Sequence, residues 1–207
     1  MINKKSVIFL ACGLFGLSVV AEWAISAGIA KAGYVERVVT MKNVGASSME
    51  TVKIYWEDDR MRMENYTVAG LGVQIKDGRT MILYQPDKKT AIKTVVPEKY
   101  AKSVQEMLAE QTNAAKGGKK TGTAKVAGIP CNVYTFAGSK GGSGKLYVST
   151  DPRFPMPLKE VVTVGTAVRT VETKVVKLNQ DIPNSMFALP KGTKVKEEKF
   201  PEQPSKQ

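Results

Sequence analysis

The sequence contains no histidine, the side chain that most often serves as a general base near neutral pH and as a metal ligand. Ser-His-Asp and Cys-His catalytic arrangements are therefore excluded, as are metal sites that need an imidazole. The acidic run Glu57-Asp58-Asp59 could bind a hard cation loosely, but consecutive side chains in a turn point in different directions. The composition favours a binding or carrier protein over an enzyme, and we expect neither a cofactor nor a metal.

Two other segments suggest chemistry at first sight. Residues 139–145 are rich in glycine, as a phosphate-binding P-loop is, but that motif needs Gly-x4-Gly-Lys followed by Ser or Thr, between a strand and a helix. Here Ser139 takes the first position, Leu146 takes the last, and both flanking segments are expected strands, so we predict a hairpin loop. Cys131 lies in an apolar strand-like segment and is expected to be a buried, inert thiol.

The chain is strongly basic, with 31 Lys and Arg against 19 Asp and Glu in 207 residues and a net charge of +12. The basic residues are scattered through expected loops and polar strand faces. A solvated basic surface is the simplest interpretation, and contact with an anionic membrane surface or an acidic envelope protein is the functional alternative. We expect no nucleic-acid partner.

Residues 1–32 have the organisation of a secretory signal peptide. A short basic start precedes the uncharged apolar run 6–21, and Ala30-Lys31-Ala32 offers the small-x-small pattern of a cleavage site. We expect cleavage after Ala32, with Ala27 and Ala30 as alternative sites and an uncleaved N-terminal anchor as the competing interpretation. A cleaved signal peptide predicts a periplasmic protein.

From residue 33 onward the hydrophobic pattern has a period of two, which is typical of strands with one buried face. Asp77-Gly78 predicts a tight hairpin, and the short spacings favour an antiparallel meander. The period becomes helical from Pro97 to Gln111, and this amphipathic helix needs the sheet as a partner for its apolar side. We expect one domain over 33–195 and, from composition, a disordered tail over 196–207.

Apolar side chains at alternating strand positions and on the expected helix form the main candidate site. Several are methionines, whose flexible side chains suit an adaptable apolar surface, but the same pattern also describes an ordinary core. From the residues alone both interpretations stay open. The set comprises Val52, Ile54, Trp56, Met61, Met63, Val73, Ile75, Met81, Leu83, Met107 and Leu108.

Three segments of the chain resemble the LolA-like superfamily of periplasmic lipoprotein carriers. They are residues 54–63, residues 76–86, which are similar to the hairpin DGKTLWFYNP of those carriers, and residues 181–195, which are similar to their closing segment. Residues 128–134 further resemble an uncharacterised exported branch rather than the lipoprotein carrier itself. The resemblance implies a mainly β fold, in which an antiparallel sheet curves into an incomplete, half-open barrel with an amphipathic helix packed on its concave side.

The resemblance also implies that the apolar set lines a cavity for acyl chains. On this basis we expect an exported, non-catalytic monomer that holds a lipid or a lipidated partner, with outer-membrane lipoprotein sorting as the most specific form of that function. The alternative is a cell-envelope interaction or sensor module, whose core is fully packed and whose basic surface binds a partner.

Overall fold

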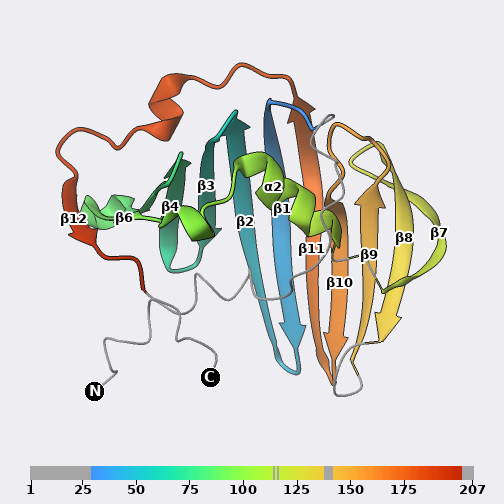
Figure 1. The fold of residues 1–207 in the computed structure, drawn as a ribbon. Helices are drawn as coiled ribbons and strands as arrows, with labels where there is room; N and C mark the ends of the chain where they lie inside the picture. The colour runs from blue at the N-terminus through green and yellow to red at the C-terminus, as the bar shows by residue number, and fades with distance from the viewer. Residues whose placement is uncertain (1–28, 114, 116, 138–141, 202–207) are drawn as a thin grey trace, which may run out of the picture.

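The computed structural model describes residues 29–113, 115, 117–137 and 142–201, so most of the expected signal peptide lies outside the described residues. Within these ranges one sheet of twelve strands is crossed by a single α-helix, α2 (Val104–Asn113) (Figure 1). The strands are β1 (Ala32–Asn43), β2 (Ala46–Glu57), β3 (Arg60–Thr67), β4 (Gly70–Asp77), β5 (Thr80–Gln85), β6 (Thr90–Val95), β7 (Lys119–Val126), β8 (Ile129–Ala137), β9 (Ser143–Ser149), β10 (Pro157–Val164), β11 (Ala167–Leu178) and β12 (Lys194–Glu198).

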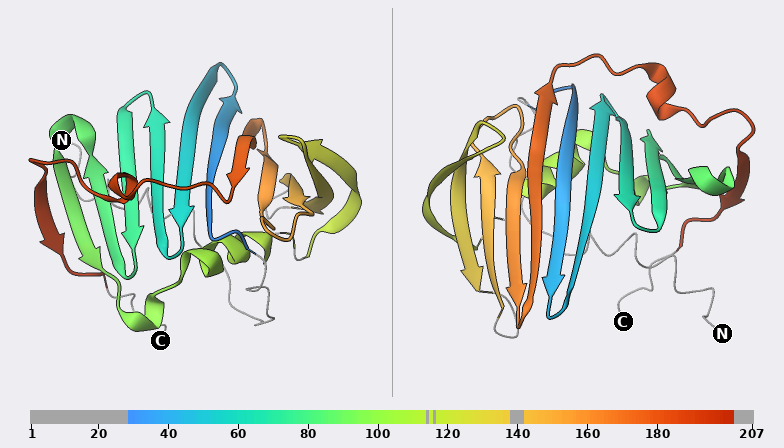
Figure 2. Two further views of the ribbon diagram at one scale, coloured as in Figure 1. Left: turned by 90° about the horizontal axis from the view of Figure 1, so that it is seen from above. Right: turned by 180° about the vertical axis from the view of Figure 1, so that it is seen from behind.

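The strand order places β1 near the middle of the sheet. From edge to edge the order is β12-β6-β5-β4-β3-β2-β1-β11-β10-β9-β8-β7, because one meander runs outward from β1 and a second returns to pair β11 with β1. Neighbours are antiparallel except for β12 and β6, which are parallel. Since β7 and β12 remain edges, the barrel is incomplete. The expected fold class is confirmed as a mainly β, curved and open antiparallel sheet with a helix on its concave side (Figure 2).

Local turn chemistry sets the hairpins next to the site. Gly78 joins β4 to β5 with a φ of 54°, a left-handed conformation that glycine adopts without steric cost, as the Asp77-Gly78 pair predicted. Asp58 has a φ of 49° in the turn between β2 and β3, a conformation that Asp tolerates better than most residues. This turn places Asp59 beside the start of α2.

The α-helix begins later than its hydrophobic period predicted. Glu98–Tyr100 form one turn of 3-10 helix, and α2 starts only at Val104. The reason is a capping box: the Ser103 hydroxyl accepts a hydrogen bond from the Glu106 amide, and the Glu106 carboxylate accepts one from the Ser103 amide. Tyr100 lies within the predicted helix but outside α2, and it is 37% exposed. No helix in the described part of the chain has the length and apolar content needed to cross a membrane.

The C-terminal segment adds a strand to one edge of the sheet. After β11 the chain passes through a 3-10 helix at Asn184–Phe187 and ends in β12, which pairs with β6. Lys93 of β6 forms an ion pair with Glu197 of β12 at 3.0 Å. Residues 196–198, which composition placed in a disordered tail, therefore belong to the sheet, because an open sheet edge offers backbone hydrogen bonds even to a polar segment. Residues 202–207 lie outside the described residues.

Buried apolar side chains form two clusters on opposite faces of the sheet. The first comprises Ile29, Val35, Ile54, Trp56, Met61, Val104, Leu108, Val126, Cys131, Phe154, Met156 and Leu158. The second comprises Val73, Ile75, Tyr84, Ala91, Ile182 and Phe187, so it includes the C-terminal 3-10 helix. On β4 the residues opposite Met61 and Met63 are Lys76 and Gln74. The alternate positions of β4 therefore point to the other face.

Candidate functional site: an apolar floor beneath α2

The candidate site is the apolar surface of the sheet on which α2 packs. We call it the apolar floor, and it consists of Val35, Val52, Ile54, Trp56, Met61 and Met63 from the adjacent strands β1, β2 and β3. Met61 lies opposite Trp56, Met63 lies opposite Ile54, and Ile54 lies opposite Val35. Residues directly opposite one another in antiparallel strands share a face, so the floor is continuous.

One side of α2 covers this floor. Val104 and Leu108 are buried one helical turn apart, and Met107 packs against the same cluster. On an exposed side of the helix, the Lys102 ammonium contacts Glu110 at 2.5 Å. Figure 1 shows α2 lying across the central strands rather than at an end of the sheet. The amphipathic helix that the sequence predicted is therefore present, on the face that carries the floor.

Trp56 is the most enclosed residue of the apolar floor. It is fully buried, its ring stacks on Phe154 with centroids 5.6 Å apart, and its Nε1 donates to the Ala30 carbonyl at 2.9 Å. Gly33 lies opposite Trp56, and a Cβ at that position would be 2.4 Å from the indole. The chain approaches the indole so closely that a side chain at residue 33 would displace the ring.

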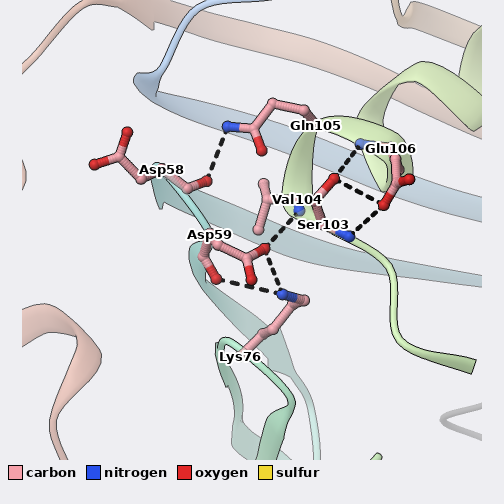
Figure 3. Close-up of polar contacts among 7 residues, drawn as sticks. All are labelled: Asp58, Asp59, Lys76, Ser103, Val104, Gln105 and Glu106. Atoms are coloured by element: carbon pink, nitrogen blue, oxygen red, sulfur yellow. Dashed lines mark hydrogen bonds and ion pairs between the residues drawn. The ribbon is translucent and has the colours of Figure 1, made fainter. Parts of the chain in front are cut away.

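Polar contacts fix the first turn of α2 to the sheet (Figure 3). The Asp59 carboxylate accepts hydrogen bonds from the Val104 amide at 3.0 Å and from the Lys76 ammonium at 2.6 Å. The Lys76 side chain is only 5% exposed, so Asp59 supplies the counter-charge that a buried ammonium needs. The Gln105 amide also donates to the Asp58 carbonyl at 2.9 Å. These contacts tether α2 at its N-terminal end, beside its apolar contacts with the floor.

The capping box adds an electrostatic contribution at the same end of α2. Hydrogen bonds from the Ser103 amide and then from its hydroxyl hold the pKa of Glu106 below its ordinary value. The carboxylate is therefore ionised at neutral pH, near the positive end of the helix dipole. The Ser-x-x-Glu pattern at 103–106 is a known sequence signal for a helix start, and it would have corrected the predicted boundary.

The structure divides the predicted site residues between the two faces of the sheet. Those that gather in or against the first cluster are Val52, Ile54, Trp56, Met61, Met63, Met107 and Leu108. Met81 and Leu83 of β5 share that face, opposite Lys76 and Gln74, but lie outside the first cluster. Val73 and Ile75 pack in the second cluster, away from α2. On β4, Val73 and Ile75 alternate with Gln74 and Lys76. Only the pairing of β4 with β3 shows that Gln74 and Lys76, and not Val73 and Ile75, are on the face that carries α2.

Sequence analysis missed three apolar residues near the start of β10 that complete this site. Phe154, Met156 and Leu158 are each almost completely buried in the first cluster. The three prolines of residues 151–157 disfavour a strand interior, and β10 starts only at Pro157. The segment before β10 has no periodicity that marks side chains turned inward, so only the burial of these residues in the first cluster identifies them.

Two hollows on the described surface lie away from the apolar floor. One of about 340 Å³ lies beside β6 and β12, where Lys93 and Phe200 are among its lining residues. The other, of about 250 Å³, lies by the turn that joins β3 to β4, and Asn65 and Asp87 contribute to its lining. Beneath α2, the side chains of Trp56, Val104 and Leu108 are almost completely buried. A ligand that binds there therefore requires α2 or the side chains of the floor to move.

The other candidate chemical groups have structural roles. In the acidic run, Glu57 forms an ion pair with Arg60, and Asp59 is the partner of Lys76. Cys131 is buried as expected, and this burial raises the pKa of its thiol. No group of three or more acidic or cysteine side chains that could hold a metal ion is found among the described residues. Part of the glycine-rich segment, residues 138–141, lies outside them.

Comparison with known proteins yields structural relatives but no sequence relatives. No family model and no curated protein matches the chain. An uncharacterised conserved protein from Thermus thermophilus matches with a TM-score of 0.54 and 10% identity, over 81% of this chain and 91% of that one. A LolA superfamily protein from Nitrosomonas europaea matches with a TM-score of 0.40 and 10% identity, over 80% and 94%.

A further match is the MucA/MucB complex of Pseudomonas aeruginosa, with a TM-score of 0.46 and 14% identity. The match covers 76% of this chain and only 56% of that one. At these identities the likeness concerns the fold alone. Membership of the LolA-like superfamily therefore stays a prediction from the three sequence segments.

Proposed function

We propose that this protein is an exported, non-catalytic carrier that holds an acyl chain of a lipid or of a lipidated partner between the apolar floor and α2. The observation that supports it most is the amphipathic helix itself. It rests on a floor of methionine, aromatic and aliphatic side chains and is tethered to the sheet through its first turn. Met61 and Met63 give this floor side chains that adapt to the shape of a ligand.

The energetics of such binding follow from the contacts beneath α2. Val104 and Leu108 contact the floor through apolar surface, which has no directional requirement. An acyl chain can therefore replace these contacts, and its burial contributes about 25 cal/mol per Å² before the cost of ordering the chain. The hydrogen bond between Asp59 and Val104 would hold one end of α2 in place while the helix moves.

The setting we propose is the periplasm, with outer-membrane lipoprotein sorting as the most specific form of the function. The signal-peptide pattern of residues 1–32 and the resemblance to LolA-like carriers support this setting. The excess of Lys and Arg over Asp and Glu would draw the protein to an anionic membrane surface or to an acidic envelope partner.

A second candidate function is a cell-envelope interaction or sensor module, and one observation favours it. Trp56, Phe154 and Leu108 are buried together in the first cluster, as they would be in an ordinary core. In that case the basic surface would bind an acidic partner, and no lipid would be carried. Salt-sensitive capture of an acidic envelope protein by a lipid-free preparation is the result expected from this alternative.

Native mass spectrometry and lipid extraction after detergent-free purification test the carrier function. We expect bound lipid on the wild-type protein and at least about a tenfold loss in M63K, because the substitution places a charge in the apolar floor. V164K is the matched control, since Val164 is exposed on β10. Circular dichroism checks that both variants fold. A wild-type protein that is repeatedly free of lipid would exclude the carrier function and favour the sensor module.

A further inference from the structure

Three buried polar side-chain atoms of the described residues have no hydrogen-bond partner. They are Arg37 Nε, Asn65 Oδ1 and Thr173 Oγ1. Asn65 of β3 lies opposite Val52 of β2, and Val52 lies opposite Arg37 of β1. Arg37 in turn lies opposite Thr173 of β11. The three residues therefore form one line across the sheet, which we call the polar row. Buried polar groups are nearly always paired, so three unpaired atoms in a single line require an explanation.

The polar row borders the apolar floor on the same face of the sheet. Two positions along their strands from the row lie the floor residues Val35, Ile54 and Met63. Residues two positions apart on a strand share a face, and they are separated by about 7 Å. The polar row thus lies next to the floor residues Val35, Ile54 and Met63. A ligand chain that lies on the floor places its end beside that line.

Arg37 carries a charge that its surroundings compensate only in part. Its Nη2 donates to the Pro157 carbonyl at 3.2 Å, while its Nε is shielded from solvent and unpaired. Burial lowers the pKa of Arg37 to about 10, and the charge of Glu160 opposes this shift. Glu160 lies 3.4 Å from Arg169 and shares its charge with that residue. At neutral pH the guanidinium is protonated and offers a free N–H donor.

Thr173 and Asn65 complete the row on either side of Arg37. Thr173 is 1% exposed, and its hydroxyl can donate or accept a hydrogen bond. It is on the strand next to Arg37, and at a strand spacing of about 4.8 Å both residues can donate to the oxygens of one carboxylate or phosphate. Asn65 is two strands away on the other side, about 10 Å from Arg37, and its Oδ1 is an acceptor.

We propose that the polar row binds the anionic head group, a carboxylate or a phosphate, of an amphiphile whose aliphatic chain lies on the apolar floor. Arg37 Nε and the Thr173 hydroxyl donate to the oxygens of the head group, and Asn65 Oδ1 accepts from a hydroxyl farther along it. The inference rests on the proposed function, because the aliphatic chain of the ligand enters beneath α2. The same movement of side chains makes the polar row accessible to the head group. An uncharged ligand leaves the row unpaired, so the row selects anionic amphiphiles.

Isothermal titration calorimetry of the purified, lipid-stripped protein at pH 8 tests this selection. The probes are dodecanoate, dodecyl phosphate and dodecanol, which share one chain length and differ in the head group. We expect both anions to bind at least about tenfold more tightly than dodecanol, the usual effect of a charge-assisted hydrogen bond. Stronger binding of dodecyl phosphate identifies a phospholipid-like head group, and stronger binding of dodecanoate identifies a fatty acid. Either result supports the proposal.

Substitutions distinguish the contribution of the polar row to binding from that of the apolar floor. R37Q should bring the ratio of anion to dodecanol affinity to about one while dodecanol affinity is unchanged, and T173V, which keeps the side-chain shape, should lower the ratio about threefold. R79Q is the control and should leave the ratio unchanged, because Arg79 is half exposed in the turn between β4 and β5, outside the row. T173V also serves as the test if R37Q does not fold.

The outcomes distinguish the two proposals. Equal affinity for anions and dodecanol in the wild-type protein would overturn the role of the row in head-group recognition, and the row would then bind ordered water. This result would leave the carrier function intact. Unchanged selectivity in both R37Q and T173V would overturn the role of the row in the same way. The absence of binding by all three probes would overturn both the role of the row and the carrier function.

Discussion

At the scale of single residues, Asp59 is the member of the acidic run that shapes the site. Its carboxylate contacts both the Lys76 ammonium and the first amide of α2, whereas Glu57 forms an ion pair with Arg60. From the sequence this run suggested at most a loosely bound cation. In the structure the cation is the buried Lys76 side chain. The run is a turn in which one carboxylate joins the sheet to the helix.

The Asp59→Ala substitution should lower the free energy of unfolding by about 3 kcal/mol, because it leaves the Lys76 ammonium buried without a counter-charge. Urea denaturation measures this loss. Asp58→Asn is the matched control and should change stability by less than about 0.5 kcal/mol, since asparagine tolerates the left-handed turn conformation. The double variant D59A/K76M should regain part of the loss. An Asp59→Ala protein as stable as the control would show that Lys76 does not need this partner.

At the scale of elements, α2 is positioned by its first turn. The helical period of residues 97–111 predicted its existence and its apolar side, and Val104, Met107 and Leu108 indeed lie against the first cluster. The helix start was predicted too early, because hydrophobic period alone does not locate a cap. The capping box of Ser103 and Glu106 sets the start, and Asp59 sets where that start lies on the sheet.

The charge of Glu106 should make the stability of α2 depend on pH. Its pKa is lowered in the folded protein, so its contribution is present above the ordinary pKa of 4.5 and is lost as the pH falls through the lower folded value. Glu106→Gln should therefore be less stable than wild type by roughly 0.5 kcal/mol at pH 7, a small value because the residue is largely exposed. Denaturation of both proteins at pH 7 and pH 3 should show the difference vanish at the lower pH. A difference of equal size at both values would exclude the carboxylate charge as its cause.

At the scale of the whole molecule, residues that precede β1 take part in the core. Ile29 is buried in the first cluster, and the Ala30 carbonyl accepts the hydrogen bond of the Trp56 indole. The Ala30 amide donates to the Arg153 carbonyl at 2.8 Å. Cleavage after Ala32, the site favoured by the small-x-small pattern, would remove all of these contacts. The alternative site after Ala27 keeps them.

We therefore expect the exported protein to begin at Gly28, which intact mass measurement of periplasmic material can establish. A chain that begins at Gly33 should be less stable than one that begins at Gly28 by about 3 kcal/mol, because it loses the burial of Ile29 and two hydrogen bonds of Ala30. Thermal and urea unfolding of the two chains, produced without a signal peptide, compare them directly. A mature protein that begins at Gly33, with unfolding unchanged by the shorter start, would contradict this expectation.

The composition excluded chemistry that needs histidine. The sequence also predicted the strands, the Asp77-Gly78 hairpin and the amphipathic helix, because each depends on residue type or on neighbours along the chain. The faces of the sheet could not be assigned in this way. Val73 and Ile75 share the alternation of strand residues with Ile54 and Trp56, yet they pack in the second cluster.

Only the tertiary structure decided which side chains meet. Phe154 stacks on Trp56 from a loop without periodicity, and β12 forms a strand because it pairs with β6. The polar row consists of residues from β1, β3 and β11. Strand register and loop packing arise between segments far apart in the chain, and a shift of one residue in register would exchange the faces of a whole strand. The sequence by itself therefore determined the elements and the class of fold, and long-range packing determined the apolar floor and the polar row.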